Sequence, residues 1–140
     1  MRPERHLALR TVVLCAAVLA ATSAASVLRA DVRTFMACRS VASGFGQVEQ
    51  ALGSEGPKAR GRFSGAEVGY FSNHLPVLLD GMGPQTRAFF DELGAGPVEL
   101  LSRSEACVMD GACDESIKEE VAFVASDLGA ACTADMQGSG

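Results

Sequence analysis

A tyrosine and a histidine lie four residues apart in the segment GYFSNHLP, residues 69–76. Tyr70 is the only tyrosine of the chain, and His74 is the only histidine after the first ten residues. On a helix, side chains at this spacing share one face, about 5–6 Å apart at Cβ. A tyrosine can ligate heme iron, and a hydrogen bond from a nearby imidazole favours its charged phenolate form. The pair therefore indicates a candidate heme-binding site with Tyr70 as the iron ligand.

Apolar side chains on both sides of this pair offer walls for a ligand cleft, which small-molecule sites generally need. The candidates are Phe71, Leu75, Met82, Phe89 and Phe90. The alternative is purely structural. Tyr70 would bury its ring and hydrogen-bond through its hydroxyl, while His74 would sit favourably at a helix C-terminus. The phenylalanines would then belong to the core, and the residues alone leave both interpretations open.

No arrangement of residues indicates an enzyme. Besides Tyr70, His74 is the candidate base, and no serine or cysteine pattern pairs with it. The acidic residues between positions 110 and 120 lack the spacing of a calcium loop, and the cysteine spacings do not match a zinc site. We therefore expect a non-enzymatic protein.

Length and charge narrow the class of protein further. A chain of 140 residues favours one domain. The net charge of −5 argues against nucleic acid or anionic lipid as the main partner. Composition leaves the oligomeric state open.

The N-terminal segment is typical of an export signal. Arg2, Arg5 and Arg10 precede the apolar run of residues 11–21, and small residues follow. We expect residues 1–25 to be a signal peptide cleaved near Ala24 or Ala25. The alternative is an uncleaved anchor, because no charged residue occurs from position 11 to 28. Either way, the chain is expected to be secreted or associated with the cell envelope.

Apolar spacing predicts an all-α domain over residues 31–135, built from about five short helices. The first helix is expected at residues 31–52, beginning at Asp31 and ending at Gly53. Its apolar stripe comprises Val32, Phe35, Met36, Val41, Phe45, Val48 and Leu52. A loop is expected to follow at residues 53–61.

Capping signals predict the later helices. A capping box from Ser64 to Glu67 predicts a helix over residues 65–74 that Pro76 disturbs. Prolines at the first helical position predict helices over residues 84–93 and 97–109. The segment SIKE, residues 116–119, is a second capping box, followed by Ile117, Val121, Val124 and Leu128 on one face. Residues 136–140 are expected to be a flexible tail.

Residues 38–107 resemble the small, exported hemophore-related proteins of mycobacteria and their actinobacterial relatives. The resemblance is carried by Cys38, GQVEQAL at residues 46–52, GYFSNHLP, PQTRAFFDEL at residues 84–93, and the later pair of Pro97 and Cys107, together with Pro57, Ala59 and Phe63. It covers about half of the chain. It implies a secreted or envelope-associated helical domain with a Cys38–Cys107 disulfide, and heme bound through tyrosine and histidine at the spacing of Tyr70 and His74.

The resemblance suggests a secreted, hemophore-like protein that binds heme in an apolar cleft near Tyr70 and His74, with Phe71, Phe89 and Phe90 as cleft residues. A membrane transporter in the envelope is then a possible protein partner. Two alternatives remain: a cofactor-free, disulfide-stapled envelope or interaction protein, and a carrier of lipid or another apolar ligand.

Four cysteines remain after signal cleavage, and an even number in an exported chain suggests disulfides. A Cys38–Cys107 bond, as the resemblance implies, would leave Cys113 to pair with Cys132. Those two flank the last expected helix, and 18 helical residues span roughly 27 Å, whereas a disulfide needs Cα atoms within about 7 Å. Either the helix breaks near residues 125–129, or Cys107 pairs with Cys113 and Cys38 with Cys132.

Overall fold

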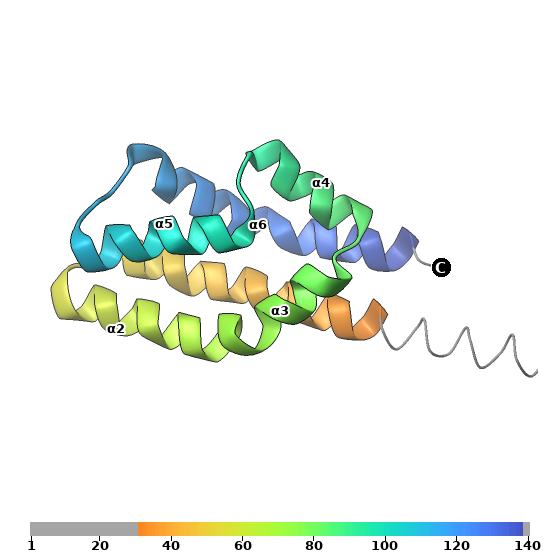
Figure 1. Cartoon of the computed structure of the whole chain (residues 1–140), viewed down its shortest axis with the longest axis horizontal. Helices are drawn as coiled ribbons and strands as arrows, with labels where there is room; N and C mark the ends of the chain where they lie inside the picture. The colour runs from red at the N-terminus through yellow and green to blue at the C-terminus, as the bar shows by residue number, and fades with distance from the viewer. Residues whose placement is uncertain (1–30, 139–140) are drawn as a thin grey trace, which may run out of the picture.

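The structure is a computed structural model that describes residues 31–138, and these residues form an all-α bundle stapled by two disulfides (Figure 1). The expected fold class is thereby confirmed. The first helix occupies residues 31–52 of the described part. The later elements are α2 (Gly56–Ala66), the π-helix η1 (Glu67–Phe71), α3 (Ser72–Gly81), α4 (Pro84–Leu93), α5 (Pro97–Asp110) and α6 (Glu115–Gly138). The expected signal peptide lies outside the described residues.

One core holds the helices together. In Figure 1 the first helix runs beside α2, while α4 and α5 lie over the long α6. The fully buried side chains include Phe45, Phe63, Leu78, Leu100, Ile117 and Leu128. They come from five different helices, so burying apolar surface stabilises the whole bundle rather than any one pair of helices. No helix among residues 31–138 is long and apolar enough to cross a membrane.

The apolar stripe of the first helix is confirmed only in its later turns. Val41, Phe45, Val48 and Leu52 are buried, but Val32 and Met36 are 45% and 57% exposed. In the first turns the small residues Ala37 and Cys38 face the core instead. The fully buried face of the first helix therefore begins at Ala37, and Met36 is left on the surface.

The expected loop at residues 53–61 is wrong for most of its length, since α2 already begins at Gly56. Pro57 lies in the first turn of α2, where its missing N–H is tolerated. Ala59, Phe63 and Ala66 bury one face, so packing stabilises a helix whose sequence has weak propensity. The capping box at Ser64 and Glu67 is consequently not used, because both residues lie within the helical run.

The helical run that contains His74 continues as α3 through Pro76 to Gly81, beyond the expected end at His74. Pro76 is exposed, whereas its neighbours Leu75 and Leu78 are buried. Burial of these two leucines on the opposite side offsets the hydrogen bond that a proline removes.

The helices α4 and α5 begin at Pro84 and Pro97 as expected, and α4 ends at Leu93 with Gly94 as its C-cap. The start of α6 differs from the prediction. Asp114 Oδ1 accepts a hydrogen bond from the backbone N–H of Ser116 at 3.3 Å, so Asp114 takes the capping role expected of Ser116. The Ser116 hydroxyl instead accepts a hydrogen bond from Arg103 at 3.2 Å.

The buried face of α6 is confirmed, since its four expected apolar residues are all fully or almost fully buried. The helix has 24 residues and extends to Gly138, so it includes part of the segment expected as a tail. It also runs through residues 125–129 without a break. Cys113 lies just before the start of this continuous helix and Cys132 lies near its far end, so the two cysteines cannot pair.

The disulfides join Cys38 to Cys132 and Cys107 to Cys113. The pairing implied by the family resemblance, Cys38–Cys107 with Cys113–Cys132, is thus wrong, and the alternative from helix geometry is confirmed. Cys107 is in the last turns of α5 and Cys113 follows just after the turn, so their Cα atoms are 4.3 Å apart. Cys38 instead faces the C-terminal part of α6, with a Cα separation of 5.8 Å from Cys132.

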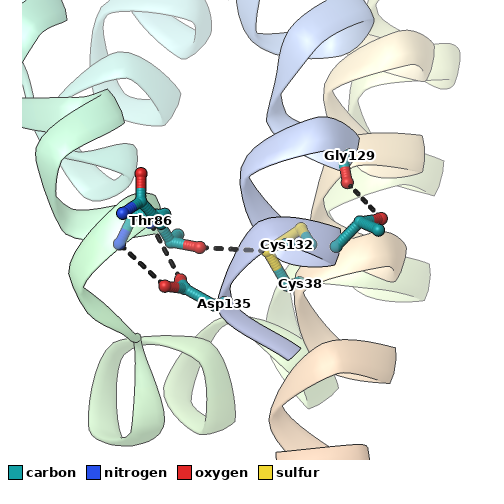
Figure 2. Close-up of a disulfide and its surroundings, with 7 residues drawn as sticks. Cys38, Thr86, Gly129, Cys132 and Asp135 are labelled. Carbon is teal, nitrogen blue, oxygen red and sulfur yellow. Dashed lines mark hydrogen bonds between the residues drawn. A yellow bond between two sulfur atoms is a disulfide. The ribbon is translucent and has the colours of Figure 1, made fainter. Parts of the chain in front are cut away.

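A polar junction surrounds the Cys38–Cys132 bridge (Figure 2). The carboxylate of Asp135, on α6, accepts hydrogen bonds from the backbone N–H groups of Gln85 at 2.7 Å and Thr86 at 2.9 Å. These are first-turn donors that α4 cannot pair internally. A Cβ atom at Gly83 would collide with this carboxylate, so a larger residue there would have to displace the carboxylate from these two hydrogen bonds. One end of α6 therefore both caps α4 and bonds covalently to the first helix.

Candidate functional site

Tyr70 lies on a π-helical turn, the element η1. The backbone N–H of Ser72 bonds to the carbonyl of Glu67, five residues earlier, instead of the usual four. Such turns insert one extra residue into a helix and are frequent at functional sites. The inserted turn alters the face on which residues 67–71 lie, and it leaves Val68 68% exposed while Phe71 is buried.

Gly44 lets the first helix approach this turn closely. A Cβ atom at that position would lie 2.8 Å from the Cβ of Tyr70 and 3.0 Å from Cζ of Phe71. Phe71 fills the interior side of the contact, with its ring edge-on to Phe45 at a centroid distance of 5.0 Å. The close approach therefore anchors η1 through Phe71 and holds Tyr70 against the first helix.

A surface groove follows from this contact. It has a volume of about 450 Å³ and lies between the first helix and η1. Its lining residues are Phe35, Met36, Arg39, Ser40, Ser43 and Tyr70. The groove thus combines an apolar wall, one cation, two hydroxyls and the phenol of Tyr70, which is half-buried.

His74 does not line this groove. It is half-buried on α3, and no hydrogen bond within residues 31–138 joins it to Tyr70. Tyr70 belongs to the π-helical turn itself, whereas His74 lies beyond its end on α3. The expected Tyr70–His74 pair is therefore not formed as a hydrogen-bonded unit.

The expected apolar cleft does not form either. Phe71, Leu75 and Phe90 belong to the buried core, with Met82 and Phe89 packed against it. Phe89 and Phe90 lie on α4, and Phe89 stacks on Phe123 of α6 at a centroid distance of 5.1 Å. These side chains stabilise the contact between α4 and α6 and do not line the groove beside Tyr70.

Sequence reasoning missed the residues that line the groove from the first helix. Met36, Arg39, Ser40 and Ser43 follow the three- and four-residue steps of one helical face. That signal was available, but it gives no indication that Tyr70 lies opposite this face.

Other hollows also occur near the first helix. The cavity beside the Cys38–Cys132 bridge has a volume of about 30 Å³, enough for a water molecule. A larger opening of about 570 Å³ lies between Arg33, Thr34 and α3, and neither tyrosine nor histidine lines it. Within residues 31–138, no three His, Cys, Asp or Glu side chains are placed to hold a metal ion together.

Comparisons of the chain with models of protein families, with curated proteins and with solved structures gave no match.

Proposed function

We propose that this chain is an exported, non-enzymatic protein that binds heme in the groove between the first helix and η1, with Tyr70 as the iron ligand. The observation that carries the proposal is the position of Tyr70 on a π-helical turn that lines the 450 Å³ groove. A phenol oxygen is an established donor to heme iron. The volume lies within the usual range of about 300–1,000 Å³ for small-molecule sites.

The lining residues suit an amphipathic, planar ligand. Phe35 and Met36 would contact the apolar macrocycle, and the guanidinium of Arg39 would bind a ligand carboxylate. Heme when bound would supply the iron, and this chain would contribute binding and orientation. His74 has no place in this revised set of contacts, since it does not line the groove.

Export is part of the same proposal. It is supported by the N-terminal pattern of charge and hydropathy and by the two disulfides. In most organisms structural disulfides occur in oxidising compartments and are rare in the cytosol. A membrane transporter of the envelope is the partner expected of a heme carrier.

A hemin titration of the full-length chain tests the proposal. We expect a Soret shift that saturates, and we expect Tyr70→Phe to abolish or displace it. His74→Asn is the matched control, because it removes a nearby half-buried polar ring that does not line the groove. Arg39→Gln should weaken binding without changing the iron spectrum. A shift that survives Tyr70→Phe unchanged would contradict the assignment of the ligand.

A second candidate is a cofactor-free interaction protein with a disulfide-stapled scaffold. It is favoured by the packing of Phe71, Phe89 and Phe90, which serve the core and leave few aromatic side chains for a ligand. The absence of any Soret shift in the titration above would favour this candidate. A carrier of lipid or another apolar ligand would instead bind a fluorescent fatty-acid probe that Tyr70→Phe does not affect.

A further inference from the structure

The two disulfides occupy very different surroundings. Cys38 and Cys132 are 2% and 3% exposed, and their bridge lies among three helices. Cys113 is exposed in the non-helical segment 111–114, and it is bonded to Cys107, which is 7% exposed. A thiolate must reach a sulfur atom directly for exchange to occur. Because Cys113 is exposed, its sulfur atom is the one that a thiolate reaches most easily.

A pocket of about 240 Å³ adjoins this exposed disulfide. Both of its cysteines line the pocket, together with residues of the first helix, of the turn before α2, and of α6. Two charged side chains are among the lining residues, Glu55 and Lys118. Both are exposed, and neither forms an ion pair or a side-chain hydrogen bond within residues 31–138.

We infer that Cys113 is a thiol-exchange site for a low-molecular-weight amino-acid thiol, whose carboxylate pairs with Lys118 and whose ammonium pairs with Glu55. The free thiolate attacks Cys113 Sγ, and the Cys113–Cys107 bond breaks. A new disulfide joins the small thiol to Cys113. The electron pair leaves on Cys107 Sγ as a thiolate, which water protonates. The small thiol is oxidised and Cys107 is reduced, so no other oxidant or reductant takes part.

The two disulfides also differ in the length of the loop that each one closes. The Cys107–Cys113 bridge closes a loop with a separation of 6 residues, against 94 for the other bridge. The loop-entropy relation therefore predicts that opening the short loop costs the fold less free energy of unfolding, so the domain stays folded more readily when Cys107 and Cys113 separate.

Peptide mapping of the oxidised, full-length chain tests the site. The protein is incubated with cysteine, quenched with acid, digested with pepsin and analysed by mass spectrometry. We expect cysteinylated Cys113 and opened Cys107–Cys113, with Cys38–Cys132 intact. Adducts on Cys107, equal opening of the two bridges, or opening of Cys38–Cys132 while Cys107–Cys113 stays closed would each overturn the inference.

A second measurement tests the pocket, because Cys107 can attack the mixed disulfide again and shorten its life. In Cys107→Ala, Cys113 is free to react with cystine and retain one cysteine unit. Lys118→Gln in this background should lower the equilibrium constant for cysteinylation roughly twofold to fivefold, the effect of one exposed ion pair. The constant for cystamine, which has no carboxylate, should not fall. Lys58→Gln is the matched control, since Lys58 is exposed on α2 and does not line the pocket. Equal effects of the two lysine variants would overturn the assigned role of Lys118.

Discussion

The two disulfides should contribute unequally to stability, and their removal in pairs measures the difference. Cys38→Ala with Cys132→Ala opens a loop with a separation of 94 residues, whereas Cys107→Ala with Cys113→Ala opens one of 6 residues. The chain-entropy relation assigns these loops about 4.7 and about 2.2 kcal/mol. The first double variant should therefore lose about 2.5 kcal/mol more of the free energy of unfolding than the second.

Burial of Cys38 and Cys132 further increases the stability that the first double variant loses. Cys38 and Cys132 are almost completely buried, so alanine leaves small cavities there, while Cys113 is exposed. The value of about 2.5 kcal/mol is therefore a lower estimate of the difference between the two double variants. For a domain of this size it corresponds to about 10 °C in melting temperature.

Urea unfolding followed by far-ultraviolet circular dichroism provides the assay. The oxidised wild type and both double variants are compared at equal concentration. The dependence of the free energy of unfolding on urea concentration is fitted separately for each protein, because a disulfide also compacts the unfolded chain. Equal losses for the two double variants, or a larger loss for the Cys107 and Cys113 pair, would refute the reasoning from loop length and burial.

Three further substitutions test other contacts. Asp135→Ala should cost about 0.5–2 kcal/mol in urea unfolding, because α4 loses its cap; no change would mean that water replaces the carboxylate. Gly44→Ala should cost about 1–3 kcal/mol, since the added methyl group overlaps Tyr70, and it should also weaken hemin binding in the same titration; unchanged affinity would separate the groove from this helix contact. Arg103→Ala removes a 2.6 Å ion pair with Glu120 and should cost up to about 1 kcal/mol in low salt. That cost should shrink when unfolding is repeated at 1 M salt, and a cost independent of salt would point to packing of the side chain instead.

Local sequence signals were sufficient for several elements. Pro84 and Pro97 marked the starts of α4 and α5, since a proline fits the first turn of a helix and disrupts later ones. The apolar face of α6 was readable because a long amphipathic helix repeats its pattern over many turns. The expected length of that same helix allowed Cys113–Cys132 only if the helix broke near residues 125–129, so helix geometry named the observed pairing as one of two possibilities.

Tertiary packing decided the rest. The start of α2 and the continuation of α3 through Pro76 depend on buried side chains such as Phe63 and Leu78, whose packing outweighs weak propensity and a lost hydrogen bond. The neighbours of Tyr70 in the candidate site were likewise decided by packing between helices. The sequence determined that Tyr70 is the only tyrosine, but its neighbours across the groove depend on the close approach at Gly44 and on the π-helical turn. Spacing along a chain defines faces only within a regular helix, whereas contacts between helices depend on how their side chains pack.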